Sequence, residues 1–363
     1  MAQATNACLG GGTAVLSPIP RMRHLALVQP RVGIGDMIWH LPHIRALARH
    51  VAGRVTLVTR PRSMADQFVG PEDGVHDILY VERGQWSPGG RHEGNAGMLR
   101  LVRDLRALDC DGAVLMTRSR NLTLAVLAMG ARHRHGYGIG MQRRVLRGPF
   151  LPRSAWKDHP YDQASTWMAA AGIALDRPDP VLNIRETDRL AALRRLWADD
   201  PVVPGRLAAP GGFVALGIAA SDEWKNWGAA RFAALAAALL NAGWPEVALV
   251  GGPAEQGMAA AITAALGPLA ARVRLVLGWH LREVAALLAE AAFYVGNDTA
   301  ALNIAAAVGT RSYGLFGATR PLLHSPLIVP VLPPGGLDRT HGMAGITPAA
   351  VMQAVERPGV GRG

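Results

Sequence analysis

The chain has 363 residues, half of them hydrophobic, which is enough for two domains of ordinary size. Two cysteines, Cys8 and Cys110, exclude a disulfide framework and fit a reducing compartment. No apolar run approaches the roughly 18 residues of a membrane-spanning helix. Residues 1–20 lack the basic start and long apolar run of a signal peptide. We therefore expect a cytoplasmic protein with a loose N-terminal tail.

Positive charge is concentrated in the first part of the chain. The formal net charge is +11. Residues 1–204 hold 27 basic against 18 acidic side chains, whereas residues 205–345 hold 9 against 8. The first part should therefore meet an anionic partner: a phosphorylated glycan, a membrane surface or nucleic acid. The alternative is a solubilising surface in an arginine-rich protein, since Lys157 and Lys225 are the only lysines.

Strand-like and helix-like runs alternate along the first half. We expect helices at 36–50, 63–68, 96–108 and 121–129, and strands at 24–28, 54–59, 77–81 and 112–116. A glycine-rich stretch at 83–97 is typical of a long functional or disordered loop. This order predicts a parallel, doubly wound sheet.

The alternation restarts after a linker at 201–212, which is rich in proline and glycine. Strands are expected at 213–218, 247–250, 273–277, 292–296 and 312–316, and helices at 229–242, 255–266, 281–289, 300–308 and 348–355. The pattern predicts an α/β protein with two Rossmann-like domains facing a central cleft, the GT-B arrangement. The predicted parts are a tail (1–20), an acceptor-side domain (21–204), a nucleotide-sugar domain (205–345), and a C-terminal helix and tail (346–363).

Gly33-Ile34-Gly35-Asp36 directly follows the first strand. In parallel sheets, ligands bind at the carboxyl ends of strands, and glycines let a ligand approach the backbone. Asp36 then has two interpretations. It caps a helix, as Asp often does, or it is the general base that takes a proton from a sugar hydroxyl.

In the second half of the chain, two segments that follow predicted strands predict a site for a diphosphate. Ser221 can hydrogen-bond a phosphate oxygen, and Lys225 can neutralise the leaving diphosphate without a metal. Lysine is so scarce here that its use at residue 225 favours a need for a compact point charge. A solvated lysine at a helix start is the alternative.

Asp298-Thr299 opens the helix expected at 300–308, whose free N–H groups suit an anion. The Thr299 hydroxyl should meet the diphosphate, while Asp298 should cap the helix or hold a sugar hydroxyl. Gly251, Gly252 and Glu255 follow the second strand of this half. Glu255 either binds ribose hydroxyls or caps a helix after a tight turn.

A basic cluster in the first half contains residues 132–135 together with Arg143, Arg144 and Arg147. It binds acceptor phosphates or is a solvated face. Because no aromatic ladder accompanies it, nucleic acid ranks low as a partner. The histidines do not repeat at metal-ligand spacings, so we expect neither a metal nor a cofactor.

Together these motifs resemble glycosyltransferase family 9, the ADP-heptose:lipopolysaccharide heptosyltransferases. The resemblance runs from about His24 to Pro321 and is most specific at Gly296-Asn297-Asp298-Thr299. It implies metal-independent, inverting sugar transfer with Asp36 as base and Lys225 as diphosphate partner. It also implies two sets of binding residues. The residues implied to bind the acceptor are Gly33, Gly35, Arg134, Arg143 and Arg144. The residues implied to bind the donor are Ser221, Gly251, Gly252, Glu255, Asp298, Thr299, Ala300 and Asn303.

This chain departs from the family at two of those positions, where Ala300 and Asn303 replace the usual Gly and His. We expect a cytoplasmic glycosyltransferase held at the inner membrane surface. It would move a sugar, with heptose from ADP-heptose as one candidate, to a lipopolysaccharide core or a related glycan. The alternatives are a protein acceptor, a catalytically reduced nucleotide-sugar-binding module and, more distantly, a nicotinamide dehydrogenase.

Overall fold

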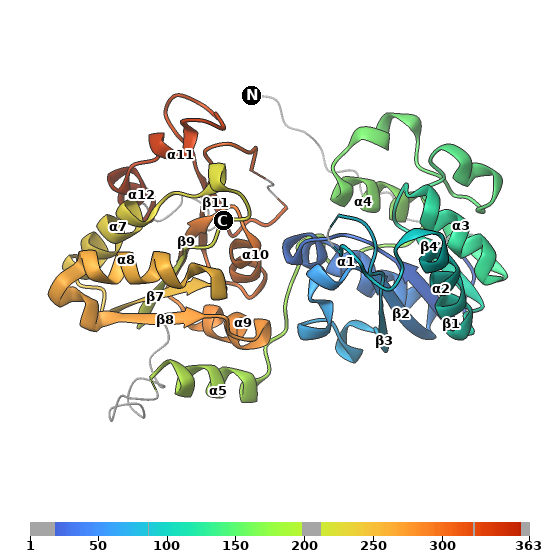
Figure 1. The fold of residues 1–363 in the computed structure, drawn as a ribbon, viewed down its shortest axis with the longest axis horizontal. Coiled ribbons are helices and arrows are strands. Elements are labelled where there is room, and N and C mark those ends of the chain that lie inside the picture. The colour runs from blue at the N-terminus through green and yellow to red at the C-terminus, as the bar shows by residue number, and fades with distance from the viewer. Residues whose placement is uncertain (1–18, 86, 198–211, 322–323, 357–363) are drawn as a thin grey trace, which may run out of the picture. The chain divides into compact units, whose positions relative to one another are not determined.

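The computed structural model describes residues 19–85, 87–197, 212–321 and 324–356. The chain separates into two compact units (Figure 1). Of the described residues, the first unit holds 19–31, 43–61 and 70–176, and the second holds 32–42, 62–69 and those from 177 onward. The predicted linker at 201–212 lies almost wholly outside the described residues, as does most of the predicted N-terminal tail.

The sheet of the first unit has five parallel strands in the order β3-β2-β1-β4-β5. Its strands are β1 (His24–Val28), β2 (Arg54–Thr59), β3 (Asp77–Tyr80), β4 (Gly112–Leu115) and β5 (His133–Gly136). The central strands β1 and β4 are almost wholly buried, which fits their continuous apolar sequences. This is the doubly wound sheet that the sequence predicts.

The helices of the first half of the chain are α1 (Ile34–Val51), α2 (Gly94–Ala107), α3 (Arg120–Met129) and α4 (Pro160–Ala170). Helices α2 and α3 pack beside each other, and Leu101, Leu105 and Val126 bury their side chains against β1 and β4. The Ser119 hydroxyl caps α3 by accepting the N–H of Leu122 at 3.4 Å.

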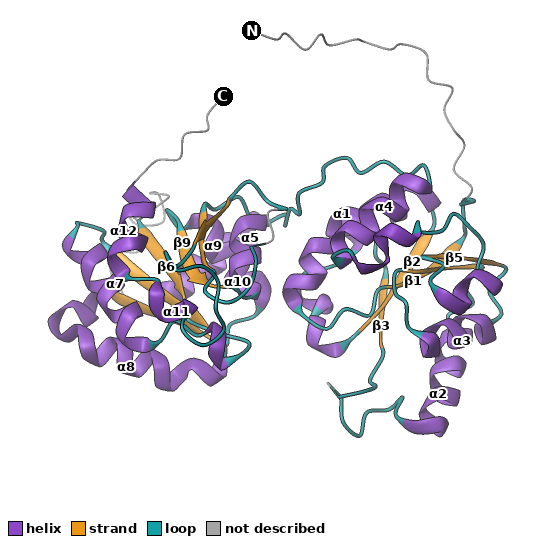
Figure 2. Cartoon of the chain, turned by 90° about the horizontal axis from the view of Figure 1, so that it is seen from above, coloured by secondary structure: helices purple, strands orange, loops and turns teal. Residues whose placement is uncertain are grey.

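The second unit contains a six-stranded parallel sheet in the order β11-β10-β9-β6-β7-β8, with helices on both faces (Figure 2). Its strands are β6 (Phe213–Gly217), β7 (Glu246–Gly251), β8 (Val273–Leu277), β9 (Tyr294–Asn297), β10 (Ser312–Leu315) and β11 (Ile328–Val331). This is the strand order of the Rossmann fold. The chain builds the sheet outward from β6 in one direction through β7 and β8, and then returns to β9 on the other side of β6 and continues in the opposite direction.

The helices of the second unit are α5 (Glu186–Leu196), α7 (Ala229–Asn241), α8 (Gln256–Leu266), α9 (Leu281–Glu290), α10 (Ala300–Ala307), α11 (Gly342–Gly345) and α12 (Pro348–Glu356). Phe232, Leu235 and Leu239 of α7 enter one buried cluster with Ile262 of α8 and Val351 of α12. None of the described helices is both long and apolar enough to cross a membrane.

Several elements differ from the sequence-based expectation. The helix expected at 63–68 is a pair of short 3-10 turns, Pro61–Ser63 and Ala65–Gln67. Strand β5 was not predicted, because its sequence His-Arg-His-Gly is polar and reads as a basic loop. Helix α5, which precedes the predicted linker, packs on α9 within the second unit.

Candidate active site

A cavity of about 570 Å³ lies within the second unit, at the carboxyl edge of its sheet. Its walls are the loops after β7 and β8 and the first turn of α10, including Gly251, Gly252, Gly278 and Thr299. This edge adjoins the reversal of strand order between β6 and β9, where open α/β sheets bind ligands. The position is therefore the one that a nucleotide ligand would take.

The bare backbone of two loops shapes this cavity. Gly278 has a φ of +66°, which a side chain rarely adopts, and it directly precedes Trp279, His280 and Leu281 in the wall. Residues 62–69, which belong to the second unit, contribute Met64 and Gln67 to the lining. The Gln67 side chain accepts the Leu281 N–H at 2.9 Å. The sequence analysis missed this part of the wall, because the lining groups are apolar or backbone and carry no motif.

Lys225 forms an ion pair with Asp298. The Lys225 Nζ lies 2.9 Å from Asp298 Oδ2, and the two side chains are only 18% and 21% exposed. The same carboxylate oxygen accepts the Thr319 hydroxyl at 2.8 Å. Asp298 therefore holds the ammonium in place, and it does not cap α10 as expected, since the N-cap residue is Thr299.

Asn297 ties this segment to the neighbouring strand. It is completely buried, and its Oδ1 accepts the Trp227 N–H at 3.2 Å. Its Nδ2 donates to the carbonyls of Ile218 and Ala219 at 3.3 and 3.0 Å. The amide thus joins the end of β9 to the loop after β6, which carries Lys225.

At the start of α10, Thr299 and Ala300 line the cavity, but Asn303 does not. Asn303 is 5% exposed. Its Nδ2 donates to the Thr299 carbonyl at 3.0 Å, and its Oδ1 accepts the Trp39 indole N–H at 2.6 Å. All three residues belong to the second unit. The Asn303 amide is therefore engaged by protein groups, and a bond from it to a diphosphate stays a prediction.

Glu255 and Asp36 each turn back onto the glycine loop that precedes them. Glu255 Oε2 accepts the Gly252 N–H at 2.7 Å, and Asp36 Oδ2 accepts the Gly33 N–H at 3.2 Å. Asp36 is thus the third residue of α1 and stabilises its first turn. Each bond uses one of two carboxylate oxygens. Asp36 thus bonds back from inside α1, and Glu255 closes the tight turn before α8 without a side-chain capping bond to α8. The ligand contacts of both residues stay predictions.

The remaining predicted residues have local partners. The Ser221 hydroxyl donates to Asp222 Oδ2 at 2.9 Å, and both residues are exposed. In the first unit, Arg143 donates to the carbonyls of Gly138 and Leu151, each at 3.1 Å. Arg134 donates to the Ala131 carbonyl, and Arg144 is exposed. The structure therefore shows Arg143 bracing its own loop.

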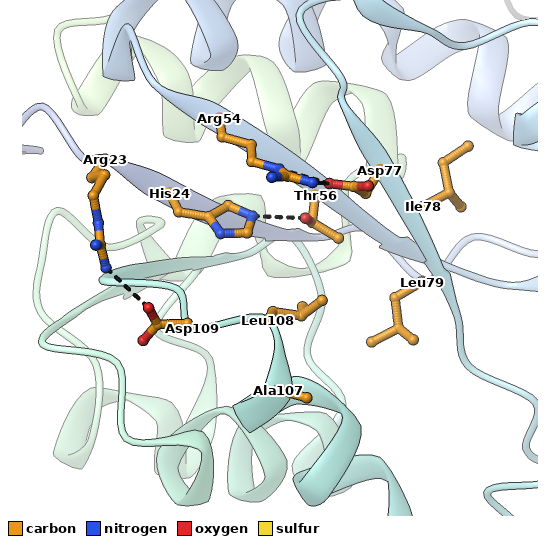
Figure 3. A pocket seen from close by; sticks show the side chains of 10 residues that line it. All are labelled: Arg23, His24, Arg54, Thr56, Asp77, Ile78, Leu79, Ala107, Leu108 and Asp109. Atoms are coloured by element: carbon orange, nitrogen blue, oxygen red, sulfur yellow. Dashed lines mark hydrogen bonds and ion pairs between the residues drawn. The ribbon is translucent and has the colours of Figure 1, made fainter.

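A second cavity, of about 680 Å³, lies at the amino edge of the first sheet. Its floor consists of paired groups, as Figure 3 shows: His24 Nε2 lies 2.8 Å from Thr56 Oγ1, and Arg54 lies 2.6 Å from Asp77. Burial lowers the pKa of His24, so its ring is neutral at pH 7. The charged side chains of this lining pair with one another, Arg54 with Asp77 and Arg23 with Asp109.

No group of three or more His, Cys, Asp or Glu side chains within the described ranges could hold a metal ion.

Comparison with known proteins identifies the family of this chain. The family model for glycosyltransferase family 9 (heptosyltransferase) matches residues 98–330. Among curated proteins, no sequence matches the chain.

Three solved structures share the fold. Escherichia coli ADP-heptose LPS heptosyltransferase II is 20% identical, with 92% of this chain and 97% of that chain aligned and a TM-score of 0.68. A Veillonella parvula family 9 glycosyl transferase is 15% identical, with 92% and 96% aligned and a TM-score of 0.71. E. coli heptosyltransferase WaaC with ADP-2-deoxy-2-fluoro heptose is 16% identical, with 92% and 99% aligned and a TM-score of 0.65.

These likenesses confirm the predicted GT-B-like architecture of two parallel sheets. Because the family model spans well over half of the chain, this protein belongs to glycosyltransferase family 9 and is an enzyme that takes its sugar from a nucleotide-sugar donor.

Proposed function

We propose that the donor diphosphate binds between Lys225 and the first turn of α10. The Lys225–Asp298 ion pair carries this proposal, because it places a cation beside a helix N-terminus at the sheet edge. As the sugar leaves, charge develops on the diphosphate, and a preorganised ammonium stabilises that charge without a metal. The nucleoside lies in the neighbouring cavity, with Glu255 toward the ribose and Gly251 and Gly252 beneath it.

In this proposal Asp36 is the general base of an inverting transfer. Its Oδ2 is held by the Gly33 N–H, and the other carboxylate oxygen receives the proton of the acceptor hydroxyl. The acceptor oxygen forms the new bond to the anomeric carbon while the bond from that carbon to the diphosphate breaks. The sugar thereby inverts its configuration, and the diphosphate departs toward Lys225.

We propose ADP-heptose as the donor and an anionic glycan, such as a lipopolysaccharide core, as the acceptor. The similar structure of E. coli heptosyltransferase WaaC holds ADP-2-deoxy-2-fluoro heptose, and that of heptosyltransferase TibC, which is 11% identical with a TM-score of 0.51, holds ADP-D-beta-D-heptose. The test is a thermal-shift panel of ADP-, UDP-, GDP- and CMP-sugars, followed by a donor-turnover assay. Stabilisation by ADP-heptose with release of ADP supports the proposal. Binding without turnover would indicate a nucleotide-sugar-binding module instead.

Peripheral attachment to an anionic membrane is proposed from one surface of the first unit. Leu99 of α2 is 73% exposed, and Leu124 and Leu127 of α3 are 40% and 39% exposed. The same two helices, which pack together, also carry the exposed basic side chains Arg100, Arg103, Arg106 and Arg120. Helix α3 has no acidic residue, and the one acidic residue of α2, Asp104, is paired with Arg91. Exposed leucines among arginines suit the interface of an anionic bilayer.

Sedimentation with lipid vesicles tests this attachment. We expect the protein to bind phosphatidylglycerol vesicles and not phosphatidylcholine vesicles, and Leu99→Asn together with Leu124→Asn to weaken binding severalfold. Leu275→Asn is the control, because Leu275 is 49% exposed but lies on β8 of the second unit. Equal binding by the control and the α2–α3 variant would contradict the proposed surface.

A further inference from the structure

Tyr294 has an unusual position beneath the first turn of α10. It is fully buried and is the first residue of the short strand β9, three residues before the carboxyl end at Asn297. Its ring passes over two glycines that are paired in register, Gly217 of β6 and Gly296 of β9. A Cβ at Gly217 would lie 1.7 Å from the phenol oxygen, and a Cβ at Gly296 would lie 2.2 Å from it. These glycines therefore leave the space that the Tyr294 hydroxyl fills.

The Tyr294 hydroxyl has no hydrogen-bond partner among the described residues, although it is buried. The same is true of the Thr299 hydroxyl, which is buried at the cavity wall. Thr299 is the N-cap residue of α10, yet its side chain makes no capping bond. A buried hydroxyl without a partner destabilises the fold, so two of them at one helix terminus indicate a role that the protein alone does not fulfil.

The two hydroxyls belong to the same local site. Burial raises the pKa of Tyr294, and the Thr299 side chain lowers it, which identifies the two side chains as neighbours. The other polar side chains of this segment are occupied. Asn297 joins β9 to the loop after β6, and Asp298 holds Lys225 and Thr319. Thr299 is thus the member of the motif whose hydroxyl remains for a ligand.

We infer that Tyr294 is a positioning residue for the donor diphosphate. When a diphosphate binds, the Thr299 hydroxyl turns to donate to a phosphate oxygen at the N-terminus of α10, and Thr299 Oγ1 then accepts the Tyr294 hydroxyl. A phenol donor fixes the rotation of the threonine hydroxyl, and each donor in such a chain polarises the next. This inference rests on the proposed function, since it requires a diphosphate at α10.

The test compares binding of a nucleoside diphosphate with binding of the corresponding nucleoside, by calorimetry on the full chain. ADP, UDP and GDP are screened first, and the tightest is kept with its nucleoside. We expect Tyr294→Phe to weaken diphosphate binding about three- to tenfold, as the loss of one hydrogen bond does, and to leave nucleoside binding unchanged. The melting temperature without a nucleotide should not fall, because the Tyr294 hydroxyl has no hydrogen-bond partner in the structure.

Two further variants separate positioning from structure. Thr299→Val removes the threonine hydroxyl at constant shape, and adding Tyr294→Phe to it should cause no further loss if the two act as one chain. Tyr313→Phe is the control. It removes a buried phenol hydroxyl from the neighbouring strand β10, where Tyr313 accepts a bond from Arg311 at 3.0 Å. Its diphosphate affinity should equal that of the wild type.

The outcomes distinguish this inference from the proposed function. If the wild type binds none of the three diphosphates, the proposed function fails and the inference fails with it. If the wild type binds one of them but Tyr294→Phe binds it equally well, only the inference is overturned. Additive losses in the double variant, or equal losses for diphosphate and nucleoside, would also overturn it.

Discussion

Lys225 Nζ and Asp298 Oδ2 lie 2.9 Å apart, although the two residues come from separate segments of the chain. They meet because β6 and β9, which precede these segments, are neighbours in the sheet. Asp298 also accepts the Thr319 hydroxyl, so its carboxylate is held from a second side. The pair fixes an ammonium at the start of α10 before any ligand arrives, which is the preorganisation that stabilises a leaving diphosphate.

Replacing Lys225 tests the need for a point charge. We expect Lys225→Ala to lower kcat at least about 100-fold, because one preorganised group at developing charge is worth that much. Lys225→Arg should stay within about tenfold of Lys225→Ala, since the planar guanidinium cannot occupy the ammonium position beside Asp298. Lys157→Arg is the matched control and should keep full activity, because Lys157 is exposed in the first unit. Full activity in Lys225→Arg would contradict the role proposed for this residue.

The variant Asp36→Asn distinguishes a general base from a residue that only stabilises the start of α1. The amide oxygen can still accept the Gly33 N–H, so the first turn of α1 should persist. Transfer should fall by about 10²–10⁴ in kcat, the usual effect of losing a general base, while donor affinity stays within a few-fold. Steady-state kinetics with a thermal melt measure both. Turnover at the wild-type rate would leave Asp36 with its role at the start of α1 alone.

Salt should affect the two substrates differently. Residues 1–204 carry most of the excess positive charge, and exposed charges are screened over about 8 Å at physiological salt. We expect KM for an anionic acceptor to rise more steeply with NaCl than KM for the donor. Donor binding should change less, because the Lys225–Asp298 pair is mostly buried. Parallel salt dependences would argue against a basic acceptor face.

The stability of the first unit should depend on pH through Asp104. Hydrogen bonds from Arg91, with His92 also in contact, lower the pKa of Asp104 to about 2. A lowered pKa in the folded state means that the bonded carboxylate stabilises the fold above about pH 4 and loses this effect as the pH falls toward 2. Asp104→Asn should therefore cost about 1 kcal/mol of unfolding free energy at pH 7, after allowance for solvent screening, and less at pH 3.

Urea unfolding of wild type and variant at both pH values measures this difference. Asp109→Asn is the control. Its ion pair with Arg23 is 89% exposed on the Asp109 side and should contribute little at either pH. A loss in Asp104→Asn that is the same at pH 3 and pH 7 would show that the carboxylate charge is not what stabilises this contact.

The sequence by itself determined the order of most strands and helices, because apolar periodicity and glycine loops are local signals. The strand at Val273–Leu277 and the helix that opens at Ala300 appear where the pattern predicts them. It also marked Lys225 through the rarity of lysine, and Asp298-Thr299 through their place at a strand end. The family followed from these motifs, and the family model confirmed it.

Partnership between distant residues was decided only by the tertiary structure. No local pattern tells that Asp298 holds Lys225 instead of capping α10, because that depends on which strands are neighbours. Strand β5 was hidden for a related reason, since its polar sequence becomes a strand by pairing with β4. The buried hydroxyls of Tyr294 and Thr299 became visible only once packing showed which polar groups lack a partner. Hydrogen-bond satisfaction is a property of the folded environment and not of the residue, so it requires the three-dimensional structure.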